Sequence, residues 1–327
     1  MTVRAFFRST KVKTATSPYD TIHLKVFYPA QISGSDLEKT QVIIPADSEK
    51  APFPVVIFFG GVNCGLENYQ WLAVKLAERG IVVVTFAWVA ENFPGTIALT
   101  PGVDTKILAS NTYGTAPTAT ALPALLAELE SLQTEGLLAG MLNLQQVILG
   151  GHSAGGRVAL ENAKPEFFPQ VAASFAYAAH SAAPIMLGFP ADTFLPLPSA
   201  LPMLLIGGTC DGVITNSRHI YGIKEDSPTR SLIRTFREAI TANRNDAYLI
   251  IIEGANHYSI VYPQDPTTDR AFLDFLTTQP QENIRSLIEE SISLFIDAHV
   301  SQQPKALAAL DKMKNELHPL IASFERK

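Results

Sequence analysis

The sequence predicts an α/β fold in which helices flank a mostly parallel sheet. Two observations predict this fold class. Strand-like and helix-like segments alternate along the chain, which is typical of a parallel sheet covered by helices. Several strand-like runs are continuously apolar, as strands buried on both faces are. The composition agrees, because 47% of the 327 residues are hydrophobic and 17% are charged, enough to bury a large core. We expect a single domain over residues 1–327.

The first elements are expected at the edge of this sheet and then in its centre. The start of the chain is basic and rich in Thr, as some transit peptides are, but Phe6, Phe7 and Val12 look like packing positions, so we expect a surface strand there. Residues 23–28 alternate polar and apolar side chains at their start and predict a half-exposed antiparallel strand. Apolar runs and helical spacing then predict a buried strand, a helix and a second buried strand, at residues 55–59, 68–79 and 81–86.

The second half of the chain continues the alternation. The expected strands are at residues 146–149, 171–178, 203–206 and 248–252, and the expected helices are at 121–132, 154–163, 228–240, 268–277 and 283–299, with an extra C-terminal helix at 304–325. Two long segments without clear periodicity, 88–116 and 180–200, interrupt these elements. Long irregular segments inside a compact fold are often functional.

The sequence GHSAGG at residues 151–156 is the strongest functional signal. A buried strand runs into it and a helix runs out of it, which predicts a tight strand–turn–helix that holds Ser153 in a strained conformation. Gly151 and Gly155 are expected because a side chain at either position would collide with neighbouring backbone. The turn also places the N–H of Ala154 at a helix N-terminus, where it favours a developing oxyanion.

A serine hydroxyl is a poor nucleophile until a base takes its proton. His257 lies just after the last predicted buried strand and is the expected base, with His180, which also follows a strand, as the main alternative. Asp211 follows the predicted strand at 203–206, so these residues give the chain order Ser, Asp, His. We expect Asp211 to orient the imidazole, and Asp192 is a weaker candidate for this role.

These motifs resemble the α/β-hydrolase superfamily over most of residues 20–300. The stretches 54–61 and 76–84 are similar to dienelactone-hydrolase, chlorophyllase and platelet-activating-factor-acetylhydrolase-like esterases. The resemblance implies a mostly parallel eight-stranded sheet, with the nucleophile, acid and histidine after its fifth, seventh and eighth strands. It also implies a second oxyanion donor after the third strand, and Val62 is the expected residue. Dienelactone hydrolases proper carry a cysteine nucleophile, and chlorophyllase-like elbows usually carry Arg where Ala154 stands, so the chain departs from both.

Large apolar side chains in the two irregular segments predict a lid over an apolar substrate cleft. Residues 179–191 contain no Asp, Glu, Lys or Arg. Ordinary packing beneath surface loops is an alternative explanation of the same side chains. The expected substrate-binding residues are Trp88, Phe93, His180, Met186, Phe189 and Phe194.

The leading function is that of a serine esterase or lipase-like hydrolase acting on a hydrophobic small-molecule ester. Two alternatives stay open: an acyltransferase or thioesterase on the same triad, and a catalytically silent fold that binds a lipid or pigment. The net charge of −6, without a dense Lys/Arg cluster, argues against nucleic acid as a partner. The longest apolar run is too short for a membrane span. Metal-ligand and dinucleotide motifs are lacking, so we expect no cofactor. The start of the chain lacks the apolar segment of a secretory signal, so we expect a cytoplasmic location, where Cys64 and Cys210 stay reduced.

Overall fold

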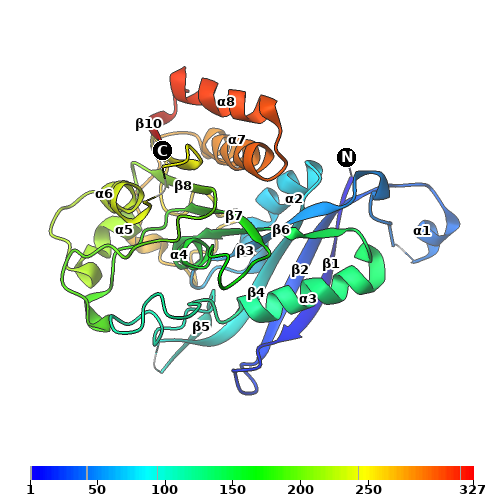
Figure 1. Ribbon diagram of the computed structural model, residues 1–327, viewed down its shortest axis with the longest axis horizontal. Helices are drawn as coiled ribbons and strands as arrows, with labels where there is room; N and C mark the ends of the chain where they lie inside the picture. Colours follow the sequence, from blue (N-terminus) through cyan, green and yellow to red (C-terminus); the bar gives the residue numbers. More distant parts are fainter. Residues whose placement is uncertain (1, 42, 94, 242, 317) are drawn as a thin grey trace.

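A computed structural model describes residues 2–41, 43–93, 95–241, 243–316 and 318–327. Within these residues the strands join a ten-stranded sheet in the order β1-β2-β4-β3-β6-β7-β8-β9-β10, with β5 paired to β4 alone (Figure 1). Their bounds are β1 Thr2–Lys11, β2 Thr21–Ala30, β3 Phe53–Phe59, β4 Val82–Phe93, β5 Thr96–Leu99, β6 Leu142–His152, β7 Val171–Tyr177, β8 Met203–Gly208, β9 Ala247–Ile252 and β10 Ile321–Arg326.

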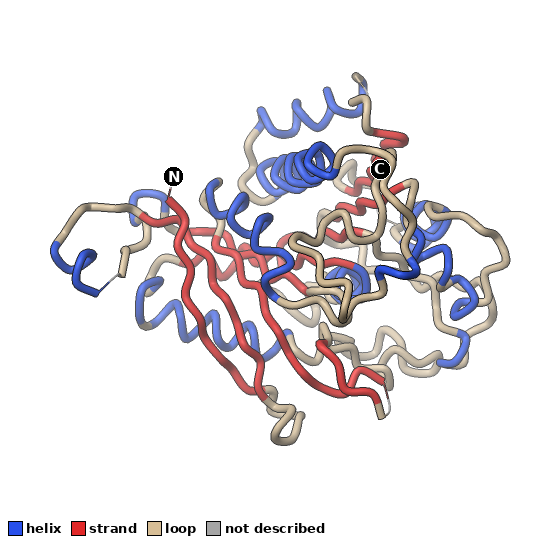
Figure 2. Tube along the Cα trace, turned by 180° about the vertical axis from the view of Figure 1, so that it is seen from behind, coloured by secondary structure: helices blue, strands red, loops and turns tan. Residues whose placement is uncertain are grey.

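The sheet is mostly parallel and has more strands than the sequence predicted. The pairs from β4 through β3, β6, β7 and β8 to β9 are all parallel. Two antiparallel strands, β1 and β2, extend one edge as long ribbons (Figure 2). All eight expected strands are present, and the unpredicted strands β5 and β10 bring the number to ten in the described part of the chain.

Helices cover both faces of the sheet (Figure 1). Consecutive residues of a strand point to opposite faces, and in β3 Val55, Ile57 and Phe59 join one buried core while Val56 and Phe58 join the other. Helices α3 (Leu122–Thr134), α4 (Ser153–Glu161) and α6 (Arg230–Arg234) pack into the first core, and α2 (Gln70–Glu78), α7 (Gln281–His299) and α8 (Pro304–Asn315) pack into the second. Two short helices complete the set, α1 (Asp36–Gln41) and α5 (Gly212–Asn216).

The strand order creates one location that is suited to a site. The chain crosses from β3 to β4 in one direction along the sheet, whereas β6 lies on the other side of β3 and the later strands continue outward from it. Ligands of such sheets bind at the carboxyl ends of the strands where the order reverses. The loop that follows β3 and the turn that follows β6 both begin at this point.

Two segments, 88–116 and 268–277, differ from the structure that the sequence predicted for them. The segment 88–116 is not all loop, because β4 continues to Phe93 and forms a hairpin with β5. The segment 268–277 is not a helix and contains only a single helical turn at Ala271–Leu273. There the carboxylate of Asp274 accepts hydrogen bonds from distant backbone N–H groups, and such tertiary contacts override local helical spacing.

The prediction of a C-terminal helix at 304–325 is wrong for the second half of that segment. Helix α8 ends at Asn315, and β10 then pairs antiparallel with β9. Pro319 explains the break, because a proline disfavours the helical conformation of the residue before it. The segment expected to form one helix is thus divided between a helix and an edge strand, with residue 317 outside the described residues. No helix among the described residues is both long enough and apolar enough to cross a lipid bilayer.

Candidate active site

The turn between β6 and α4 is as tight as the sequence predicted. β6 ends at His152 and α4 begins at Ser153, whose φ of 55° lies in the left-handed region. A non-glycine residue there costs about 1–3 kcal/mol, so the surrounding packing must hold the turn. A Cβ at Gly155 would lie 2.3 Å from the carbonyl oxygen of Phe59, and one at Gly151 would lie 2.5 Å from the Gly155 carbonyl. Both glycines are therefore required by close backbone contacts.

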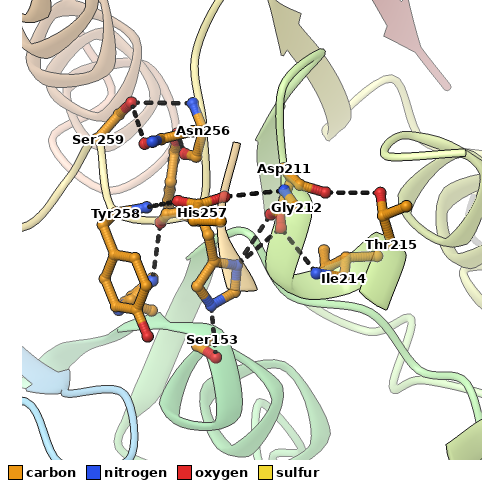
Figure 3. A network of polar contacts seen from close by, with 12 residues as sticks. Ser153, Asp211, Gly212, Ile214, Thr215, Asn256, His257, Tyr258 and Ser259 are labelled. Atoms are coloured by element: carbon orange, nitrogen blue, oxygen red, sulfur yellow. Dashed lines mark hydrogen bonds and ion pairs between the residues drawn. The ribbon is translucent and has the colours of Figure 1, made fainter. Parts of the chain in front are cut away.

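The structure brings Ser153, Asp211 and His257 together, although they are far apart in the sequence (Figure 3). The Oγ of Ser153 lies 2.9 Å from Nε2 of His257. The Nδ1 of His257 lies 2.9 and 3.1 Å from the two carboxylate oxygens of Asp211. The three side chains thus form a continuous chain of hydrogen bonds from a hydroxyl through an imidazole to a carboxylate.

Asp211 is itself held by the short helix that it precedes. It is the N-cap of α5, and its Oδ1 accepts a hydrogen bond from the N–H of Ile214 at 2.8 Å. Its backbone carbonyl accepts another from the Thr215 hydroxyl at 2.7 Å. A carboxylate at a helix N-terminus is stabilised by the free N–H groups there. Because Asp211 is almost fully buried, these contacts leave its second oxygen committed to His257.

A second carboxylate, Asp274, joins the two loops that carry the acid and the base. Its Oδ1 accepts from the N–H of Gly212 at 2.8 Å, and its Oδ2 accepts from the N–H of Tyr258 at 3.2 Å. These two residues directly follow Asp211 and His257 in the chain (Figure 3). The sequence did not predict this role, because nothing in the pattern around Asp274 shows which distant N–H groups it meets.

The electrostatic environment of His257 favours its protonated form. Burial lowers the pKa of the imidazole, but the charge of Asp211 and the hydrogen bond to it raise the pKa, as does Asp274, and the balance lies above the ordinary value. Burial and the neighbouring Asp211 charge also raise the pKa of Asp274. The site therefore stabilises a positive charge on His257, which is the charge that a base acquires when it takes a proton from a serine.

Two backbone N–H groups, of Val62 and Ala154, are available as hydrogen-bond donors in the described part of the structure. The Gly61 N–H donates to the Tyr69 hydroxyl at 2.9 Å, whereas the N–H of Val62 has no hydrogen-bond partner among the described residues. The N–H of Ala154 lies in the first turn of α4, where N–H groups lack a partner within the helix. The loop after β3 and the elbow are in direct contact, because a Cβ at Gly155 would lie 2.3 Å from the carbonyl oxygen of Gly60. Both expected oxyanion donors are thus on adjoining segments.

The residues expected to bind substrate lie in different environments. Trp88 is buried in the core, and its indole N–H donates to the Tyr19 carbonyl at 2.9 Å. It also borders a cavity of about 10 Å³ beside Gly60 and Gly61, which has room for a single water at most. Phe93 ends β4, and its side chain lies outside the described part of the structure. Trp88 therefore supports the loop after β3 rather than lining an open cleft.

The other expected substrate residues belong to the second irregular segment. His180 is buried against the ring of Tyr221, and burial together with the charges of Arg157 and His257 lowers its pKa to about 3. It is therefore neutral and near His257, but Ser153 bonds to His257 instead. Of the remaining three, Met186 is exposed, Phe189 packs between the loops and Phe194 lies beneath the guanidinium of Arg234.

The two irregular segments pack against each other. Leu108 from the first and Ala183 and Leu195 from the second form a small buried apolar cluster of their own. The N–H of Ser110 donates to the Leu187 carbonyl at 3.0 Å, and the Tyr113 hydroxyl donates to the Pro196 carbonyl at 2.9 Å. The segments therefore form one connected layer next to the carboxyl ends of the strands.

Neither a metal-binding cluster among the described residues nor a similar curated protein indicates the chemistry of this site. Within the residues that the structure describes, no group of three or more His, Cys, Asp or Glu side chains is arranged to hold a metal ion. No protein-family model matches the chain, and no curated protein is significantly similar to it. The chemistry of the site is therefore inferred from its own geometry.

Proposed function

We propose that this protein is a serine hydrolase that cleaves carboxylic esters through an acyl-enzyme intermediate. The observation that carries the proposal is the chain of hydrogen bonds from Ser153 through His257 to Asp211, with 2.9 Å on each side of the imidazole. A strained serine at the tip of a parallel strand, a base within hydrogen-bond distance and a buried carboxylate that orients the base are the parts that nucleophilic acyl transfer requires.

The strand order supports a place in the α/β-hydrolase superfamily. If β5 and β10 are set aside, eight strands remain, in the order β1-β2-β4-β3-β6-β7-β8-β9. Ser153 follows the fifth of these along the chain, Asp211 the seventh and His257 the eighth. These are the positions that the resemblance in the sequence implies for the nucleophile, the acid and the histidine.

The proposed reaction has two halves. In the first, His257 takes the proton of Ser153 while the serine Oγ attacks the ester carbonyl, and the N–H groups of Val62 and Ala154 bind the oxyanion. His257 then gives the proton to the alcohol, which leaves, and the acyl group stays on Ser153. In the second half, water attacks the acyl-enzyme with His257 again as base, and the acid is released.

The substrate is proposed to carry an apolar acyl or alcohol group. The support for this is the apolar cluster in which the two irregular segments meet, around Leu108 and Leu195. His180, at the start of the second segment, is a neutral side chain close to the base. An apolar layer in the segment that begins at His180 favours ligands whose own surface is apolar.

A fluorophosphonate probe tests the proposal directly, because it reacts with a serine that a neighbouring base activates. We expect it to label the wild-type protein and Ser286→Ala, which changes an exposed serine on α7, and to leave Ser153→Ala unlabelled. Hydrolysis of a nitrophenyl ester should be lost in the same variant. Equal labelling of Ser153→Ala and wild type would contradict the proposal. Acyl transfer to an added alcohol in preference to water would instead assign the acyltransferase reaction.

A further inference from the structure

His152, the residue before the nucleophile, has no part in the steps above, yet its imidazole is fully buried in the middle of the site. It packs among the rings of Tyr69, Tyr177, Tyr258 and His257, with the His257 ring centre 4.9 Å away. Burying two polar ring nitrogens costs free energy unless each has a hydrogen-bond partner. In this structure each nitrogen has one.

The donors and acceptors around His152 can be assigned from their chemistry. The Gly61 N–H only donates, so the Tyr69 oxygen accepts from it at 2.9 Å. The His257 carbonyl only accepts, so Nε2 of His152, at 3.0 Å, carries a hydrogen. In a neutral imidazole Nδ1 is then the acceptor, and the Tyr69 hydroxyl donates to it at 2.9 Å.

The neutral state follows from the surroundings. Burial and the adjacent His257 hold the pKa of His152 well below its ordinary value. A positive charge on His152 would repel the imidazolium that His257 becomes during the reaction. The assigned tautomer therefore supports His257 by a hydrogen bond to its backbone without adding a charge beside it.

These contacts connect the three segments on which the proposed mechanism depends. Gly61 precedes the oxyanion donor Val62, His152 precedes Ser153, and His257 is the base. We refer to the hydrogen bonds from Gly61 through Tyr69 and His152 to His257 as the His152 network. A Cβ at Gly61 would lie 2.9 Å from Nδ1 of His152, so only glycine permits this close approach.

We propose that His152 is a positioning residue. Together with Tyr69 it holds the loop after β3, which carries Val62, and the backbone of His257 in fixed positions relative to Ser153. This inference rests on the proposed function. His152 is neither the nucleophile nor the base. It acts by holding both of them in place. Displacements of about 1 Å at such a site can cost 100-fold in rate.

Two replacements of His152 separate its two hydrogen bonds. His152→Asn keeps an acceptor near the position of Nδ1 and loses the donor to the His257 carbonyl. His152→Gln keeps a donor near Nε2 and loses the acceptor for Tyr69. His152→Phe removes both, and Tyr69→Phe removes only the hydroxyl between Gly61 and His152. We expect His152→Phe and Tyr69→Phe to lower kcat about 10- to 100-fold with little change in KM, and His152→Gln to recover part of the loss.

The matched control is another tyrosine–histidine pair, in which the tyrosine is buried and the histidine is half-buried. The Tyr248 hydroxyl lies 2.9 Å from Nε2 of His299, away from the site on β9 and α7. Tyr248→Phe removes a hydrogen bond of the same kind and length, so it shows what a loss of stability alone does to kcat. We expect it to lower Tm about as much as Tyr69→Phe and to leave kcat unchanged.

Nitrogen-15 NMR of histidine-labelled protein gives a readout other than activity. For His152 we expect a protonated Nε2 and an unprotonated Nδ1 throughout the titration of His257. A His152 that is protonated on Nδ1 in the active protein would overturn the inference. So would kcat values for His152→Phe and Tyr69→Phe that fall no further than that of Tyr248→Phe, while the fluorophosphonate still labels the wild type. A wild-type protein that the probe does not label would instead overturn the proposed function, and the inference with it.

Discussion

At the scale of single residues, His257 is held through each of its hydrogen-bonding side-chain atoms and through its carbonyl. Nδ1 bonds to Asp211, Nε2 bonds to Ser153, and the carbonyl accepts from His152. The imidazole therefore has one orientation and one tautomer before any substrate binds. Preorganised groups of this kind need little rearrangement at the moment of reaction.

Asp211→Asn should remove most of the activity. An amide in place of the carboxylate can present N–H to Nδ1, which stabilises the tautomer with its hydrogen on Nε2, and that tautomer cannot accept the Ser153 proton. We expect kcat to fall about 10³- to 10⁴-fold, measured with a nitrophenyl ester. The control is Asp192→Asn, because both carboxylate oxygens of Asp192 pair with Arg230 instead of with a histidine. Loss of activity in Asp192→Asn with Asp211→Asn still active would reverse the assignment of the acid.

Asp274 should raise the pH at which the protein becomes active, in addition to the larger effect of Asp211. The base must be neutral, so kcat/KM should rise with pH through the pKa of His257, which lies above its ordinary value of about 6.5. Asp274→Asn removes a negative charge that raises this pKa. The midpoint of the rise should therefore move to lower pH than in the wild type. A pH profile of kcat/KM measures it, and a midpoint that moves upward would show that Asp274 does not act on His257 by its charge.

At the scale of elements, the centre of the sheet and its β1 edge could be predicted, whereas the opposite edge strand β10 and the hairpin strand β5 could not. A strand buried on both faces must be apolar throughout, so the runs that became β3, β8 and β9 were recognisable alone. An edge strand such as β10 carries a mixed pattern, and only its pairing with β9 makes it a strand. The same distinction applies to the site. Ser153 and Asp211 could be predicted, because they lie in turns at strand ends that have their own sequence signals. Tyr69 acts through contacts that local pattern does not record.

The strand β10 should contribute measurably to stability. Ile321 is buried and pairs with Ile252, the last residue of β9. Replacing a buried isoleucine with alanine costs about 2–5 kcal/mol, so Ile321→Ala should lower the free energy of unfolding by an amount in this range. Urea denaturation measures it, with Lys314→Ala on the exposed face of α8 as the control. Equal midpoints for the two variants would indicate that the segment does not pack as a strand of the sheet.

At the scale of the whole molecule, the sheet separates two cores and gathers the site at one edge. The segments that hold Ser153, Asp211 and His257 follow β6, β8 and β9, and His180 follows β7. Parallel strands point their carboxyl ends to the same edge, so one topology brings together residues that the sequence keeps far apart. The core helices lie on the faces of the sheet, which leaves this edge to the two irregular segments.

The two irregular segments should set the preference for acyl chain length. If their apolar cluster borders the acyl group, each additional buried methylene contributes about 0.8 kcal/mol, or roughly fourfold in kcat/KM. We expect kcat/KM to rise from short to medium nitrophenyl esters in the wild type, and to rise less steeply in Leu108→Ala, which shrinks the cluster. Leu276→Ala is the control, since that leucine is 90% exposed. A steady fall in kcat/KM as the chain lengthens would show that the cluster only joins the two segments, and that the acyl group lies elsewhere.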